Sequence, residues 1–363
     1  MVQGPLARPI PRVDPITDLP LLVLFPHSRC NCRCLMCDIW RVTAADEIES
    51  REVAAWLSEW RAFGVKRVVL SGGEALLHSH LWELCELLRQ ADIGITILST
   101  GLLLRRHASE LVRYCDDVVV SLDGPREIHD KIRNIPRAYD RLADGVAAVK
   151  AADQSVRVSG RCTVQRANFR ELRRTVVAAR EIGLDRISFL AVDVSTEAFN
   201  RPGGWGGERV REVALQRHEL PLLAAELDAM LPGGGLPCGA ITELAGPREG
   251  GGGMTLAMFF AARAAGESGR CVVIVDRAGE FYPPAAGPLG LEMQQLVVVR
   301  PSGWAEAVWA FEEALRCEAV GAVVGALGRL DTRAARRLQL AAERGGGVGL
   351  VLPDRVQGSG FRG

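Results

Sequence analysis

Short apolar segments alternate with amphipathic helical segments through the first half of the chain, and this alternation restricts the fold more than any other feature. Six segments have the length and apolar character of strands: 21–25, 66–71, 93–99, 117–122, 156–164 and 186–192. Strands separated by helices pair in parallel through right-handed crossovers. We therefore expect an α/β fold with a partial (β/α)6 barrel of the TIM type, which carries its chemistry at the carboxyl ends of the strands.

The segment that follows the first of these strands is rich in cysteine. Cys30, Cys34 and Cys37 have the spacing C-x3-C-x2-C, and Cys32 lies between them. Three thiolates so close on a loop can ligate three irons of a [4Fe-4S] cluster and leave one iron without a protein ligand. The alternative is one zinc ion bound by all four sulfurs, but structural zinc sites usually take two Cys-x-x-Cys pairs from separate segments. The spacing favours the cluster, with Cys32 as its neighbour.

Glycines and polar residues stand at the ends of the later strands. The pair Gly72-Gly73 permits close approach of the backbone to a ligand, and Glu74 can accept a hydrogen bond from an ammonium group. The other polar positions at strand ends are Thr100, Ser121, Asp123 and, on the fifth strand, Arg161. Two of them have a purely structural alternative. Asp123-Gly124-Pro125 can be a capped turn, and Arg161 can be a solvated side chain at a strand edge.

These motifs together resemble the radical S-adenosylmethionine (radical SAM) superfamily, over about residues 18–230. The resemblance implies a [4Fe-4S] cluster on Cys30, Cys34 and Cys37, with SAM chelated by the remaining iron. One-electron reduction then cleaves SAM to methionine and a 5′-deoxyadenosyl radical, which abstracts hydrogen from a peptide or small-molecule substrate that the sequence does not identify. The expected electron donor is a protein such as flavodoxin or ferredoxin.

The resemblance also implies which residues contact SAM. Glu74, after Gly72 and Gly73, corresponds to the element that binds the amino group of SAM, and Arg161 is expected to pair with its carboxylate. Met36 takes a place that is often aromatic and close to adenine, where a thioether can fill the same space. Hydroxyl and carboxylate contacts are expected from Thr100, Ser121 and Asp123.

A second α/β segment follows the radical SAM-like part. After an irregular arm at 1–20, we expect a first domain at 21–231, a Gly/Pro linker at 232–239 and a second domain at 240–363. Its strands are expected near 240–245, 271–275, 296–299, 319–324 and 348–352. The residues Ile241–Pro247 and Val275-Asp276, with Phe281 and Pro283 after them, resemble the RecA-like ATPase core, and within it proteins of the ImuA and SulA type.

The phosphate-binding loop of this second domain is incomplete. A working P-loop ends in Gly-Lys-Ser/Thr, but residues 246–255 contain no lysine. Ala278 and Gly325 also stand where a catalytic glutamate and a magnesium-binding aspartate are expected. Because phosphoryl transfer depends on those charges, we expect a degenerate module that binds a protein partner, rather than the alternative of an active ATPase.

Composition restricts the partners and the compartment. With 44 basic and 44 acidic residues, the formal net charge is zero, which argues against bulk attraction to nucleic acid or to an anionic membrane. The absence of a leader pattern or a bilayer-length apolar run predicts a cytoplasmic protein. A second hypothesis is a RecA-like accessory protein of DNA repair or the SOS response with a vestigial N-terminal domain, but the complete cysteine motif beside an incomplete P-loop favours the radical SAM enzyme.

Overall fold

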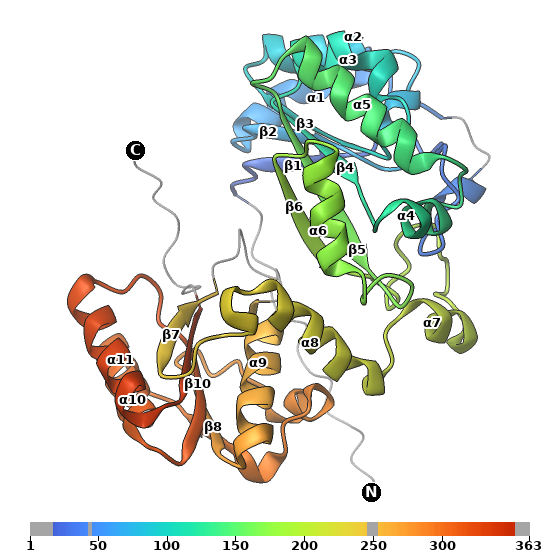
Figure 1. The fold of residues 1–363 in the computed structure, drawn as a ribbon. Helices are drawn as coiled ribbons and strands as arrows, with labels where there is room; N and C mark the ends of the chain where they lie inside the picture. The colour runs from blue at the N-terminus through green and yellow to red at the C-terminus, as the bar shows by residue number, and fades with distance from the viewer. Residues whose placement is uncertain (1–16, 43–45, 245–252, 353–363) are drawn as a thin grey trace, which may run out of the picture. The chain divides into compact units, whose positions relative to one another are not determined.

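The computed structural model describes residues 17–42, 46–244 and 253–352 (Figure 1). The contacts within the chain divide it into two compact units between Ala214 and Leu215. The irregular arm and the glycine-rich loop fall mostly outside the described residues, since 1–16 and 245–252 are not among them. In the described part of the chain, no helix has both the length and the apolar character required to cross a bilayer.

The first unit contains one parallel sheet of six strands in the order β1-β2-β3-β4-β5-β6. These are β1 (Leu21–Leu24), β2 (Arg67–Leu70), β3 (Gly94–Ser99), β4 (Asp117–Ser121), β5 (Arg157–Val164) and β6 (Arg186–Ala191). Each strand lies where the apolar segments predict it, and neighbours in the sheet are neighbours in the sequence. The α/β class and the six-stranded parallel sheet are thus confirmed, and the arrangement fits the partial barrel.

Helices carry the chain from each strand to the next: α1 (Ser50–Ala62), α2 (Leu81–Gln90), α3 (Ala108–Tyr114), α5 (Ala138–Ala152) and α6 (Leu172–Glu181). A capping box between Glu49 and Glu52 begins α1. Residues such as Leu84 on α2 and Leu142 on α5 pack with strand residues such as Ile97 in one buried core. Burying an aliphatic side chain of this size contributes roughly 2 kcal/mol.

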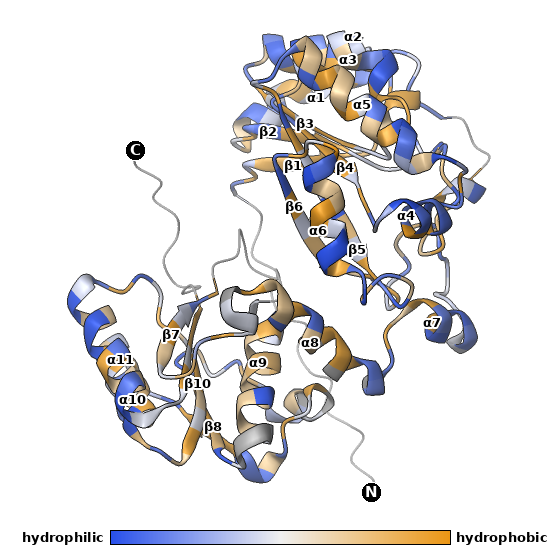
Figure 2. Ribbon diagram, in the orientation of Figure 1, coloured by the Kyte–Doolittle hydropathy of each residue, from blue (hydrophilic) through white to orange (hydrophobic). Residues whose placement is uncertain are grey.

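Two further helices of the first unit were not predicted. The helix α4 (Arg126–Arg133) lies between the fourth and fifth strands, before α5, and α7 (Gly207–Val213) lies after the sixth strand. Figure 2 shows α4 largely in the hydrophilic colour. Its four-residue spacing of buried or half-buried positions, Ile128 and Ile132, was the available signal.

The second unit contains a parallel sheet in the order β7-β11-β10-β8-β9. Its strands are β7 (Ala240–Glu243), β8 (Cys271–Val275), β9 (Leu296–Val299), β10 (Val320–Ala326) and β11 (Val348–Leu352), close to the predicted segments. Alternate residues of β8 pack in two different hydrophobic cores. Ile274 packs in the cluster that contains α9 (Gly253–Ser268), whereas Val273 packs in the cluster that contains α10 (Trp304–Arg316) and α11 (Thr332–Gly345). Helices therefore cover both faces of the sheet.

The helix α8 (Leu220–Met230) lies in the second unit, although we expected the first domain to extend to residue 231. The physical reason is its packing. Leu227 and Leu231 contact the core that contains α9, and Asp228 pairs with Arg263 of α9 at 3.0 Å. The helix thus precedes the predicted linker in sequence but belongs with the sheet that follows it.

Candidate functional site

The cysteine loop connects β1 to a short 3-10 helix at Ile39–Arg41. Cys34 is buried, and Cys30 and Cys37 are half-buried. Burial raises the pKa of Cys30 to about 12 and that of Cys37 to about 11, and the charge of the nearby Cys34 adds to both shifts. The three thiols of the motif are therefore near enough to influence one another electrostatically.

The described residues contain no group of three His, Cys, Asp or Glu side chains arranged around one metal ion. In a cubane cluster each of the three cysteines binds a separate iron, so the three sulfurs need not converge on one point.

The carboxyl end of α4 holds the backbone of this loop. Arg33 N–H donates to Arg133 O at 3.1 Å, and Leu35 N–H donates to Ile132 O at 3.0 Å. The two hydrogen bonds flank Cys34 on either side. They use carbonyl groups that the last turn of a helix leaves free, so α4 fixes the middle cysteine of the motif in place.

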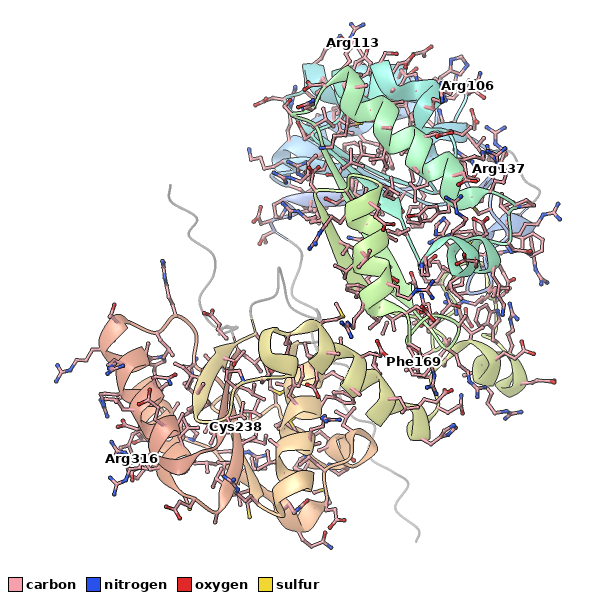
Figure 3. The ribbon with its side chains drawn as sticks, in the orientation of Figure 1. Arg106, Arg113, Arg137, Phe169, Cys238 and Arg316 are labelled. Carbon is pink, nitrogen blue, oxygen red and sulfur yellow. The ribbon has the colours of Figure 1, made fainter. Side chains whose placement is uncertain are left out.

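The side chain of Arg133 reaches the same cysteine. Its Nη1 donates to Cys34 Sγ at 3.4 Å, and its Nη2 lies 2.5 Å from Asp123 Oδ2. A hydrogen bond with Cys32 and the Arg133 guanidinium lower the pKa of Cys34 to about 6. Arg106, Arg113 and Arg137 differ from Arg133, since their side chains are exposed at the outside of the first unit (Figure 3).

Asp123 is fully buried and is occupied within the protein. Besides Arg133, its Oδ1 accepts from Thr163 N–H at 2.9 Å, and its own N–H donates to His129 Nδ1 at 3.1 Å. The capped-turn alternative for this residue thus has a physical basis, because its polar groups join the end of β4 to β5 and α4. The structure places Asp123 near the cysteine loop through Arg133.

Glu74 is also fully buried and engaged. Its carboxylate accepts hydrogen bonds from Ser99 Oγ at 2.9 Å, from Leu76 N–H at 3.2 Å and from both the N–H and the hydroxyl of Thr100. Burial raises its pKa, and these hydrogen bonds oppose that shift. The Glu74 side chain therefore ties the end of β2 to the end of β3.

The two glycines before Glu74 lie against the cysteine loop. A Cβ atom on Gly73 would lie 1.9 Å from Arg29 O, and one on Gly72 would lie 2.8 Å from His27 O. Gly72 also has a φ of 104°, which a side chain disfavours. The close approach for which these glycines are needed is thus to the protein's own backbone, just before Cys30.

Ser121 and Arg161 are aligned partners in neighbouring strands β4 and β5. The Nε atom of Arg161 is buried and has no hydrogen-bond partner among the described residues. A buried donor without a partner costs free energy, so a ligand acceptor at this position would stabilise the site. A carboxylate is the acceptor that suits a guanidinium best.

The segment that follows β6 packs on the cysteine loop from another side. Trp205 Nε1 donates to Asp38 Oδ2 at 2.7 Å, and Arg209 of α7 donates to Leu35 O at 2.6 Å. Met36 is buried in the same cluster, which includes Cys34 and Val213. Sequence reasoning missed Trp205 and Arg209, because no local pattern relates residues so far apart.

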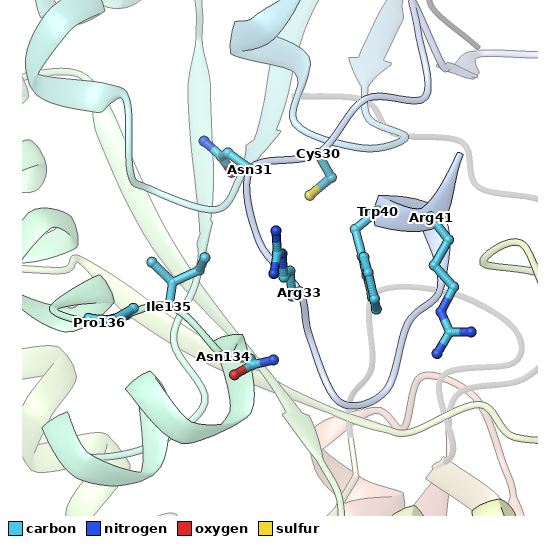
Figure 4. A pocket seen from close by; sticks show the side chains of 8 residues that line it. All are labelled: Cys30, Asn31, Arg33, Trp40, Arg41, Asn134, Ile135 and Pro136. Carbon is cyan, nitrogen blue, oxygen red and sulfur yellow. The ribbon is translucent and has the colours of Figure 1, made fainter. Parts of the chain in front are cut away.

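A pocket of about 790 Å³ opens beside Cys30 (Figure 4). Its other lining residues are Asn31, Arg33, Trp40, Arg41, Asn134, Ile135 and Pro136. The guanidinium carbon of Arg33 lies 5.9 Å from the centre of the Trp40 ring, and that of Arg41 lies 5.0 Å from it. Arg41 also pairs with Asp38, whereas no carboxylate of the described residues pairs with Arg33. The pocket thus has a cationic, partly aromatic wall.

Residues 24–179 match the model of the Radical SAM superfamily. This part of the chain is therefore similar to the radical SAM superfamily. Among its relatives is the AdoMet-dependent heme synthase of Methanosarcina barkeri, which is 27% identical over 174 residues, or 46% of this chain and 49% of the relative. Protein ImuA of Caulobacter vibrioides is 37% identical over 136 residues, or 36% of this chain and 56% of that protein. The chain thus spans about half the length of the curated relatives it matches.

Among solved structures, Streptococcus suis SuiB bound to S-adenosylmethionine has a TM-score of 0.47 and 15% sequence identity, covering 59% of this chain and 48% of SuiB. The match to this superfamily indicates an enzyme, and the cofactors that it indicates are a [4Fe-4S] cluster and SAM. The donor set fits them. Three sulfurs on one loop suit the cluster, and the unpaired Arg161 Nε suits an anionic group of SAM.

Proposed function

We propose that this chain is a radical SAM enzyme that holds its cluster on Cys30, Cys34 and Cys37 and takes a hydrogen atom from its substrate. The observation that carries the proposal is the placement of these three thiols on one loop, supported by α4 and by Gly73. With cluster and SAM bound, the chemistry supplied is one-electron cleavage of SAM to methionine and a 5′-deoxyadenosyl radical. The protein's own residues orient the reactants and exclude water.

Arg161 is the residue that we assign to the SAM carboxylate, with Ser121 beside it on β4. The buried, unpaired Nε supports this assignment. Glu74 and Asp123 differ from Arg161, because their carboxylates already accept hydrogen bonds from other residues of the protein. For these two residues, and for Met36 and Thr100, direct contact with SAM stays a prediction.

The reducing electron needs an entry point close to the cluster, and the pocket beside Cys30 is our candidate. Its arginines favour a donor with an acidic surface around its redox group, as expected for a flavodoxin or ferredoxin. Arg33 contributes most to this selectivity because it has no carboxylate partner among the described residues, whereas Arg41 is already paired with Asp38. The Methanosarcina relative is named a heme synthase, so a heme precursor is the first substrate to test.

We infer that the second unit is a RecA-like module without ATPase activity, which supplies a surface for a protein partner. The match with ImuA and the five-stranded parallel sheet support this inference. Asp276, at the end of β8, accepts hydrogen bonds from Glu280 N–H and Phe281 N–H and lies 3.4 Å from Arg300 Nε. Its carboxylate is thus engaged in closing a turn, and residues 246–255 contain no lysine to bind phosphate.

Anaerobic reconstitution with iron and sulfide, followed by reduction with dithionite in the presence of SAM, tests the proposal through the release of 5′-deoxyadenosine. The competing hypothesis is a RecA-like accessory protein of DNA repair with a vestigial first domain. It predicts salt-sensitive DNA binding instead, without SAM cleavage.

A further inference from the structure

Arg133 is a cation buried beside the middle cysteine of the motif. Its side chain is 8% exposed, and that of its partner Asp123 is 0% exposed. Burying an ion pair carries a desolvation cost of several kcal/mol, which the attraction between the two charges does not always repay. The ion pair is therefore weak evidence that Arg133 stabilises the fold. The contact between Arg133 and Cys34 suggests a role at the cysteine instead.

The backbone of α4 holds the backbone of Cys34 close to the Arg133 guanidinium. The hydrogen bonds from Arg33 N–H to Arg133 O and from Leu35 N–H to Ile132 O hold the residues on both sides of Cys34. The same residue, Arg133, thus supplies a backbone acceptor to the loop and a side-chain donor to the sulfur, at 3.4 Å. Any group bound by Cys34 would have this fixed positive charge as a neighbour.

Hydrogen bonds to cluster sulfurs and nearby charge are among the features that set the reduction potential of an iron–sulfur centre. A one-electron reduction adds negative charge to the cluster, and a neighbouring cation stabilises that reduced state. We propose that Arg133 is a positioning residue that raises the reduction potential of the cluster through its contact with Cys34, and that Asp123 limits this effect. This inference rests on the proposed function, since it requires a cluster on Cys34.

Substitutions of Arg133 and of Asp123 should shift the midpoint potential of the cluster in opposite directions. Arg133→Met removes the charge and the donor, so the midpoint potential becomes more negative, and Arg133→Lys restores part of the difference. Asp123→Asn retains an acceptor for Thr163 N–H but removes the negative charge, so the potential becomes more positive. A merely structural role would loosen the site in both variants and would not give shifts of opposite sign.

The experiment is a dye-mediated redox titration of the reconstituted proteins without SAM, followed by electron paramagnetic resonance of the reduced cluster. Iron content is measured first, and Arg113→Met, at an exposed arginine of the same unit, is the control. Failure of the wild type to take up iron would overturn the proposed function itself. Equal potentials, or shifts of the same sign in Arg133→Met and Asp123→Asn, would overturn this inference alone. If Arg133→Met holds no cluster, Arg133→Lys takes its place in the comparison. A more negative potential in Arg133→Lys and a more positive one in Asp123→Asn would support the inference, and equal potentials or shifts of the same sign would overturn it.

Discussion

Trp205 Nε1 donates a hydrogen bond to Asp38 Oδ2 at 2.7 Å, across 167 positions of the sequence. This hydrogen bond joins the segment after the last strand of the first unit to the loop that carries the cysteines.

Trp205→Phe retains an aromatic ring but removes the N–H donor, so the Asp38 carboxylate loses this hydrogen bond. We expect the free energy of unfolding to fall by about 1–3 kcal/mol, measured by urea denaturation of the protein without cofactors. Trp309→Phe, at a 60% exposed indole, is the control and should leave it unchanged. A Trp205→Phe protein as stable as the wild type would show that the bond is dispensable.

The four cysteines of the loop should divide into three ligands and one neighbour. Cys34→Ala removes a corner of the cluster, so we expect loss of the cluster's iron and of its visible absorption. Cys32→Ala should retain both, because the buried Cys32 is a neighbour and the three ligands remain. Iron and sulfide analysis after reconstitution measures the difference. Equal loss in both variants, or zinc as the metal retained on purification, would favour a four-sulfur zinc site.

Reversal of the Arg33 charge should affect reduction by a protein but not by a small reductant. Because Arg33 contributes an unpaired positive charge next to Cys30, Arg33→Glu should slow cluster reduction by reduced flavodoxin on the order of tenfold at low salt. Reduction by dithionite should be unchanged. Stopped-flow absorbance at two salt concentrations measures both rates. An equal rate with flavodoxin for variant and wild type would place electron entry elsewhere on the chain.

His129 should make the stability of the protein depend on pH. Burial, followed by the charge of Arg133, lowers its pKa from 6.5 to about 3, so the folded state binds a proton less readily than the unfolded state. The stability it contributes is complete above pH 6.5 and is lost as the pH falls toward 3. The expected slope from this one group is at most about 1.4 kcal/mol per pH unit.

His129→Asn retains an acceptor for Asp123 N–H and does not titrate in this range. We expect its unfolding free energy to decline less steeply between pH 6 and pH 4, in urea titrations of the protein without cofactors. His80→Asn, at an exposed histidine, is the matched control. Equal slopes for wild type and His129→Asn would contradict the buried, neutral state of His129.

The sequence predicts the sheet of the first unit well because its strands are apolar runs of buried residues such as Val68, Ile97 and Val120. It predicts the strands of the second unit for the same reason. The short helix α4 escapes the prediction, since charged residues predominate in it and its buried face is narrow. The placement of α8 also escapes it, because the salt bridge between Asp228 and Arg263 is a tertiary contact.

The candidate site shows the same division. Cys30, Cys34 and Cys37 are evident from their spacing, and the Gly72-Gly73-Glu74 motif is evident from its place after a strand. The Glu74 carboxylate accepts hydrogen bonds from Ser99 and Thr100. These contacts form because the ends of two strands lie side by side in the folded chain, and the sequence of either segment alone does not predict them. Partners from distant segments, such as Arg133 for Cys34 and Trp205 for Asp38, required the folded chain.

The most direct test of the radical SAM assignment is the amount of 5′-deoxyadenosine released from SAM by the reconstituted, dithionite-reduced full chain under anaerobic conditions. Liquid chromatography with mass detection measures it together with methionine. We expect both products to form in equal amounts from the wild type and to be absent from Cys34→Ala. A wild-type protein that holds its full complement of iron and binds SAM, yet releases no more 5′-deoxyadenosine than Cys34→Ala, would contradict the account.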